Sequence, residues 1–192
     1  MNTPSHWLMT ISVGKIGPWK QNCPKWALGL GSIAPDIPLY FLSFGGIAYF
    51  GWWLGWDMKT VERHLFANLY YHDPAWISLH NILHSPTMIG LILLLIFPLQ
   101  KTFPSACRWL KFFLFACLMH SLVDVVTHFD DGPVLFFPFN WNYRFSSPVS
   151  YWDPAHHGRI FMVFEVLLDL LLAFWLIYRR QNVQKPKIEE VS

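Results

Sequence analysis

The chain has 192 residues, of which 54% are apolar and 18% aromatic, whereas only 14% are charged. Ordinary soluble domains carry roughly 25% charged residues, so this composition disfavours a soluble enzyme. It also excludes a disordered chain, which would be poor in apolar side chains. The net charge of +2 is too small to indicate nucleic-acid binding. The three scattered cysteines give neither a disulfide framework nor a thiolate metal site. We therefore expect the chain to lie in a membrane.

Four apolar stretches approach the length of about 20 residues that a bilayer-spanning helix needs. They lie at residues 37–56, 86–100, 108–128 and 160–178. The second is short by itself, but its charge-free run begins at Pro74, and Gly45-Gly46 weakens the middle of the first. Trp and Tyr cluster at the ends of the runs, as interfacial anchors do. We predict an all-α, polytopic membrane bundle of about four transmembrane helices, with residues 1–180 as a single membrane-embedded domain.

The basic residues predict the orientation of this bundle. They gather before the first stretch, between the second and third, and after the fourth: Lys15, Lys20, Lys25, Lys101, Arg108, Lys111, Arg179, Arg180, Lys185 and Lys187. The other two connections hold four basic residues, which six acids offset. Cytoplasmic loops are enriched in Lys and Arg. We therefore expect both termini, including a polar tail over residues 181–192, to be cytoplasmic, and the membrane to be a plasma or inner membrane.

His80 and His84 are four residues apart and so share one face of a helix. Neutral imidazole is a common ligand of zinc and related metals, and two imidazoles at this spacing can bind one ion. The alternative is a pair of interfacial histidines that bond to water or to lipid headgroups.

The segment MHSLVDVVTH carries ionisable residues at every fourth position. His120, Asp124 and His128 project from one stripe if the helix continues through residue 128. Asp124 lies inside an apolar run, where an unpaired carboxylate costs several kcal/mol, so it needs a partner, a cation or a wet cavity. The pattern favours a metal site, in which Asp124 is a ligand or orients a ligating histidine. The alternative is a His–Asp hydrogen bond that joins two spans.

Glu165 and Asp169 form another pair of acids, four residues apart within the last apolar stretch. Acids inside a membrane are candidates for a functional site. Their partner is expected to be a histidine at position 156 or 157, a metal, or Arg159. The alternative is that the two acids simply face a hydrated interior of the bundle.

Asp36 stands between Pro35 and Pro38, which break any helix there. An Asp at this place favours an N-cap of the following helix.

Taken in chain order, these residues resemble the motifs of the YdjM-like family of membrane-bound metal-dependent hydrolases over roughly residues 6–145. The motifs are an early His, a Pro-Asp-Ile segment, a His…His-Ser motif, a His-x-x-x-Asp-x-x-Thr motif, and a Gly followed by an aromatic-Pro stretch. They are carried here by His6, Asp36, His80, His84, Ser85, His120, Asp124, Thr127, Gly132 and LFFPFNWNYRF. The His-x-x-x-Asp pair is more distantly similar to the zinc-dependent phospholipase C and single-strand nuclease group, which hydrolyses phosphodiesters with clustered divalent metals.

The chain departs from the family pattern in several places. Pro38 replaces a second carboxylate after Asp36, and the His80–His84 motif is one residue shorter. The gap between Asp124 and Gly132 is two residues longer, and no clear His-x-x-x-Glu follows. These differences predict altered specificity, fewer metals, or lost catalysis.

The resemblance implies a site with one or two divalent ions, and zinc is expected because the ligands are rich in nitrogen. The predicted metal-binding residues are His6, His80, His84, His120, Asp124 and His128. Asp36 is predicted to complete the metal shell or to act as the catalytic general base. The expected substrate is a phosphodiester or a lipid-like ester of the membrane, cleaved by a metal-activated water. The alternative is a non-catalytic membrane protein, either an ion or proton pathway or a structural bundle.

One geometric conflict accompanies this hypothesis. If Asp36 begins a span of 20 residues, that span is about 30 Å long and separates Asp36 from His84 at the opposite face. The conflict disappears if residues 37–56 form a hairpin broken at Gly45-Gly46, or if the site lies within the bundle and excludes Asp36.

Overall fold

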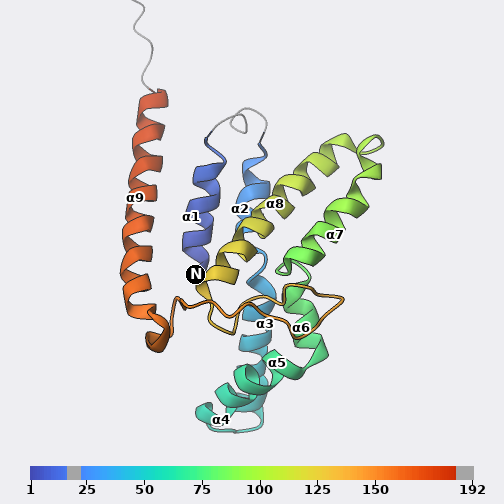
Figure 1. Cartoon of the computed structure of the whole chain (residues 1–192), viewed down its shortest axis with the longest axis vertical. Coiled ribbons are helices and arrows are strands. Elements are labelled where there is room, and N and C mark those ends of the chain that lie inside the picture. The colour runs from blue at the N-terminus through green and yellow to red at the C-terminus, as the bar shows by residue number, and fades with distance from the viewer. Residues whose placement is uncertain (17–22, 185–192) are drawn as a thin grey trace, which may run out of the picture.

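The computed structural model describes residues 1–16 and 23–184, which form helices and irregular segments without any β-strand among them (Figure 1). The elements are α1 (Thr3–Val13), α2 (Lys25–Ile33), α3 (Ile37–Gly46), η2 (Ile47–Trp53), α4 (Met58–Glu62), η3 (Arg63–Leu69), α5 (Tyr70–His72), α6 (Pro74–Asn81), α7 (Pro86–Ile96), η4 (Pro98–Gln100), α8 (Pro104–Thr127), η5 (Pro154–His156) and α9 (Gly158–Gln184). The prediction of an all-α membrane bundle is confirmed.

Two helices are long and apolar enough to cross a membrane by themselves, α8 and the part of α9 over Gly158–Gln181. Two further candidates are bent pairs: α2 with α3 and η2, bent by 40°, and α6 with α7, bent by 58°. The described chain therefore has two spans, or up to four if each bent pair counts as one.

A proline near the start of the second helix of each pair accounts for both bends. Pro38 stands in the first turn of α3, where its ring fits, but the residues before it cannot continue a regular helix. Pro86 has the same place in α7, and the Ser85 side chain caps that helix by accepting a hydrogen bond from the Met88 amide. The first expected span is shifted, because its pair begins at Lys25 rather than at residue 37. The second pair begins at Pro74, where the charge-free run also begins.

The tightest helix contact joins α2 to α8. A Cβ atom on Gly31 would lie 2.2 Å from the Phe113 carbonyl oxygen and 2.8 Å from the Ala116 Cβ. Only a glycine permits the two backbones to approach this closely, as is common where helices pack in membranes. The contact brings the C-terminal half of α8 against the end of α2.

α9 lies alongside α1 and exposes most of its remaining surface (Figure 1). Glu165 is buried and accepts hydrogen bonds from the Asn2 amide (2.7 Å) and the Asn2 side chain (2.8 Å). The Ser5 hydroxyl donates to Asp169 (2.7 Å). The two acids therefore bind α1, whereas His156, one of the expected partners, contacts Asp153 (2.6 Å). The exposed apolar face of α9 suits contact with lipid.

Replacing Glu165 by Leu is expected to weaken the attachment of α1, because two donors of Asn2 lose their acceptor. A typical hydrogen bond contributes about 0.5–1.5 kcal/mol, and water can partly replace the acceptor because Asn2 is exposed, so thermal unfolding in detergent should begin at a slightly lower temperature. Leu167→Ala, on the exposed face of the same helix, is the control and should unfold like the unmodified protein. Equal unfolding temperatures for all three proteins would contradict this account.

The predicted tail begins within α9, which continues through Gln184. Residues 185–192, with Lys185 and Lys187, and the segment that holds Lys20 lie outside the described residues.

Candidate metal site

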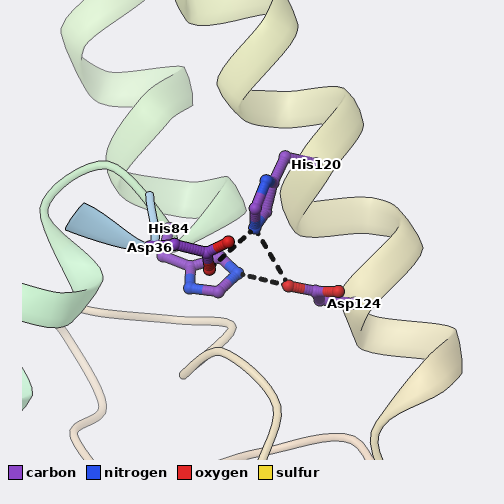
Figure 2. Close-up of side chains that lie close together, drawn as sticks. All are labelled: Asp36, His84, His120 and Asp124. Carbon is purple, nitrogen blue, oxygen red and sulfur yellow. Dashed lines mark hydrogen bonds and ion pairs between the residues drawn. The ribbon is translucent and has the colours of Figure 1, made fainter. Parts of the chain in front are cut away.

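Four side chains converge where the two bent pairs break. Asp36 lies between α2 and α3, and His84 lies between α6 and α7, whereas His120 and Asp124 face them from α8 (Figure 2). One ligand atom from each side chain lies within 4.8 Å of the other three. We call these four residues the Asp–His cluster. The breaks resolve the expected conflict, because Asp36 stands in the middle of a bent pair rather than at its end.

Asp124 is the centre of the cluster. Its Oδ2 lies 3.1 Å from His84 Nε2 and 3.0 Å from His120 Nε2. His120 Nε2 is also 3.3 Å from Asp36 Oδ1, which connects the second carboxylate. His84, His120 and Asp124 are buried, whereas the Asp36 side chain keeps 17% of its surface exposed. Two carboxylates and two imidazoles thus share one small polar region inside an apolar bundle.

The hydrogen bonds of His120 fit a metal ligand. Its Nδ1 lies 2.7 Å from the Ser32 carbonyl oxygen and must donate to it, so a neutral ring carries its lone pair on Nε2. This Nε2 is buried and makes no hydrogen bond within the described part of the chain, although two carboxylate oxygens surround it. A metal-binding histidine characteristically has its second nitrogen held in this way by a carbonyl or carboxylate.

His84 is oriented from both sides. Its Nδ1 lies 2.9 Å from His80 Nε2, and the Ser121 hydroxyl donates to its carbonyl oxygen. His80 and His84 therefore contact each other, and only His84 reaches Asp124. The predicted pair is therefore brought together, but His80 contacts the cluster only through His84.

The other oxygen of Asp124 has different neighbours. His6 Nε2 lies 2.9 Å from Oδ1, and the amino group of Met1 donates to the same oxygen at 2.8 Å. The His6 ring also stacks on His120 with ring centroids 3.7 Å apart. His6 thus lies beside the cluster, on the far side of Asp124.

His128 does not continue the stripe of His120 and Asp124. α8 ends at Thr127, and His128 has extended backbone angles. Its Nδ1 lies 3.0 Å from the Asp124 carbonyl oxygen, to which it must donate. Burial lowers the pKa of His128, so its ring is neutral near pH 7 and Nε2 carries the lone pair. His128 therefore lines the site as a potential proton acceptor.

Asp36 differs from its expected role as a helix cap. Its side chain makes no capping hydrogen bond to α3, although it occupies the cap position. Instead it accepts a hydrogen bond from the Thr3 hydroxyl and faces His120. The interaction with His120 outweighs a cap because it pairs a partly buried carboxylate with an imidazole.

A cavity of about 780 Å³ opens beside the cluster. Asp36, His84 and Asp124 line it, together with His80 and His128. Its remaining walls include aromatic side chains from α3, η3, α5 and the segment after α8: Tyr40, Phe66, Tyr70, Tyr71, Tyr151 and Trp152. The cavity therefore combines a polar metal-ligand set with aromatic walls, as ligand sites commonly do.

The Tyr70 wall of the cavity is rigidly held. The Tyr70 hydroxyl donates to the Asp131 carbonyl oxygen (2.6 Å), and Arg144 lies over the ring, 4.8 Å from its centroid. Burial raises the pKa of Tyr70 well above its ordinary value, so the hydroxyl keeps its proton and this bond persists at alkaline pH.

Several partners of the cluster carried no sequence signal. The Met1 amino group, the Thr3 hydroxyl and the Ser32 carbonyl belong to positions that no metal-ligand pattern marks. Only a known close approach of α1, α2 and α8 would have identified them.

A membrane-embedded bundle with an Asp–His cluster is consistent with the family resemblance of the sequence motifs. No curated protein and no solved structure matches the chain. The model of one protein family, described as the YdjM inner membrane protein, matches residues 1–183. Because this match covers nearly the whole chain, the protein belongs to the YdjM inner membrane protein family.

Proposed function

We propose that this inner membrane protein is a metal-dependent hydrolase that cleaves a phosphodiester or a lipid-like ester. The observation that carries the proposal is the convergence of Asp36, His84, His120 and Asp124 beside a cavity large enough for a small substrate. Imidazole and carboxylate are the ligands that zinc prefers in catalytic sites, so zinc is the ion we expect. A divalent ion held there would supply Lewis-acid chemistry and lower the pKa of water toward neutrality.

The surrounding side chains suit acid–base work. Asp36 is the cluster residue with the greatest exposure and lines the cavity, so it can accept a proton from water near the ester. His128 offers a second acceptor through its neutral Nε2. Ser32 and His80 hold the rings of His120 and His84 in orientation, which limits the reorganisation needed when an ion binds.

His120→Ala is expected to remove most of the bound metal and to abolish hydrolysis. The change deletes one of the candidate ligands and leaves the Ser32 carbonyl without its donor. Elemental mass spectrometry of the detergent-purified protein would measure the metal, and a panel of phosphodiester and lipid ester substrates would measure turnover. His72→Ala, at an exposed histidine outside the cluster, is the matched control and should retain both.

The opposite result would be a well-folded protein that binds no metal even after reconstitution with zinc or manganese. Ion or proton flux through liposomes without hydrolysis would then favour a permeation pathway. A lower unfolding temperature of His120→Ala with neither activity present would favour a purely structural bundle.

A further inference from the structure

The helices of the bundle define two opposite ends, which differ in their charged residues. α1 and α9 run in parallel, because Asn2 pairs with Glu165 and Ser5 pairs with Asp169. α2 returns along α1, and α7 leads away from the cluster to the turn from which α8 comes back (Figure 1). The end of α1, the start of α2, the α7–α8 turn and the last turns of α9 therefore lie at one end, which we call the distal end (Figure 1). The Asp–His cluster lies toward the other end, which we call the site end.

Charge separates along the same axis. The described segments of the distal end carry basic residues and no acid: Lys15, Lys25, Lys101, Arg108, Lys111, Arg179 and Arg180. The site end carries four basic residues, Lys59, Arg63, Arg144 and Arg159, against six acids, Asp57, Glu62, Asp73, Asp130, Asp131 and Asp153. An excess of Lys and Arg marks the cytoplasmic side of a membrane protein, and acids contribute little to the rule.

We propose that the cavity opens on the non-cytoplasmic side of the membrane and takes an ester-bearing amphiphile from that leaflet. The choice of an ester rests on the proposed function, whereas the sidedness rests on the charge distribution alone. The short helices α4 and α5 and the segment over residues 128–157 then lie outside the cytoplasm. Met1 lies beside the cluster, in the half of the bundle nearer to the site end. Of the two predicted cytoplasmic positions, only that of the C-terminal end of α9 is therefore kept.

The position of the cluster along α9 indicates which half of the membrane holds it. Glu165 is seven residues after Gly158, which corresponds to about 10 Å along α9. Its partner Asn2 follows Met1, whose amino group reaches Asp124. The spanning part of α9 has 24 residues and is therefore about 36 Å long, with its midpoint about 18 Å from either end. Glu165 is thus about 10 Å from the site end of α9 and about 8 Å from its midpoint, so the cluster lies in the half of the membrane nearer to the site end, which suits a substrate taken from that leaflet.

The lining of the cavity includes residues of the site end. Glu62 ends α4 and Arg63 begins η3, and both line the cavity. Asp130 and Trp152, from the segment after α8, line it as well. These residues belong to the site end, so a ligand enters from that side without crossing the apolar bundle.

Cysteine labelling tests the sidedness. In a background with Cys23→Ser, Cys107→Ala and Cys117→Ala, single cysteines would replace Ser146 at the site end and Thr102 at the distal end. Both positions are exposed, and neither belongs to the cluster. A membrane-impermeant maleimide should label S146C in right-side-out vesicles and T102C in inside-out vesicles only.

The reverse pattern, or equal labelling of both positions from one side, would overturn the proposal. If the background fails to fold, C-terminal fusions of the unmodified chain give an independent reading. A fluorescent protein fused there should fluoresce and alkaline phosphatase should be inactive, and the opposite pair of results would place the cavity in the cytoplasm. Labelling requires neither bound metal nor turnover, so the two proposals are tested separately. If the labelling shows the reverse orientation, the protein can still be a hydrolase, with a substrate on the cytoplasmic side. If no hydrolysis is found, the labelling result still establishes the orientation.

Discussion

Asp124→Ala is expected to abolish metal binding and to destabilise the protein more than any other single change in the cluster. The carboxylate contacts His84 and His120 through one oxygen, and His6 and the Met1 amino group through the other. Removing one partner from a buried ion pair typically costs about 3–5 kcal/mol, because the remaining charge stays buried without compensation. Thermal unfolding in detergent and elemental mass spectrometry would measure the two effects.

Two variants separate charge from packing in this experiment. Asp124→Asn keeps the shape and one acceptor oxygen, so it should unfold closer to the unmodified protein than Asp124→Ala does, but still lose metal. Asp130→Asn changes an exposed acid of the same cavity and should leave both quantities unchanged. Full metal occupancy in Asp124→Ala would refute the assignment of this carboxylate to the metal site.

Gly31→Ala is expected to have the second largest effect, although it adds a single methyl group at a residue outside the Asp–His cluster. The new Cβ would meet the Phe113 carbonyl, a backbone atom that cannot rotate away, and α2 would have to separate from α8. Overpacking of this kind costs about 1–3 kcal/mol. The separation would also lengthen the bond between His120 and the Ser32 carbonyl, so metal affinity should fall together with the unfolding temperature.

Gly45→Ala is the matched control, since nothing lies within 4 Å of the Cβ that it would add in α3. Alanine is favoured over glycine in a helix by roughly 0.5–1 kcal/mol, so this variant should be as stable as the unmodified protein or slightly more stable. Similar losses in both variants would show that helix propensity, rather than the α2–α8 contact, determines the result.

The sequence predicts those parts of the fold and site that depend on local periodicity. The apolar runs of α8 and α9 are continuous, and the four-residue spacing places His120 and Asp124 on one face of α8. The Asp36 flanked by prolines marks a true helix break. These features require no knowledge of neighbouring helices, which explains why they are visible without a structure.

The remainder depends on contacts between distant segments. Hydropathy places the first span at residues 37–56 because α2 contains Lys25 and two glycines, yet α2 is the half that packs on α8. The partners of Glu165 and Asp169 lie more than 160 residues away in α1, so no local pattern could identify them. The place of Asp36 in the cluster likewise depends on the bend between α2 and α3.

The two helix breaks have a consequence for how such a site can change over evolutionary time. A broken helix inside a bilayer leaves backbone carbonyls that water cannot reach, and here His120 satisfies that of Ser32 while Ser121 satisfies that of His84. The polar residues of the site and the backbone of the bends therefore support each other. A lineage that loses the chemistry cannot discard His120 or Ser121 without cost, because either loss leaves a buried carbonyl without its donor unless the helix straightens in the same step. Selection for folding alone would then preserve these two residues after the activity had gone.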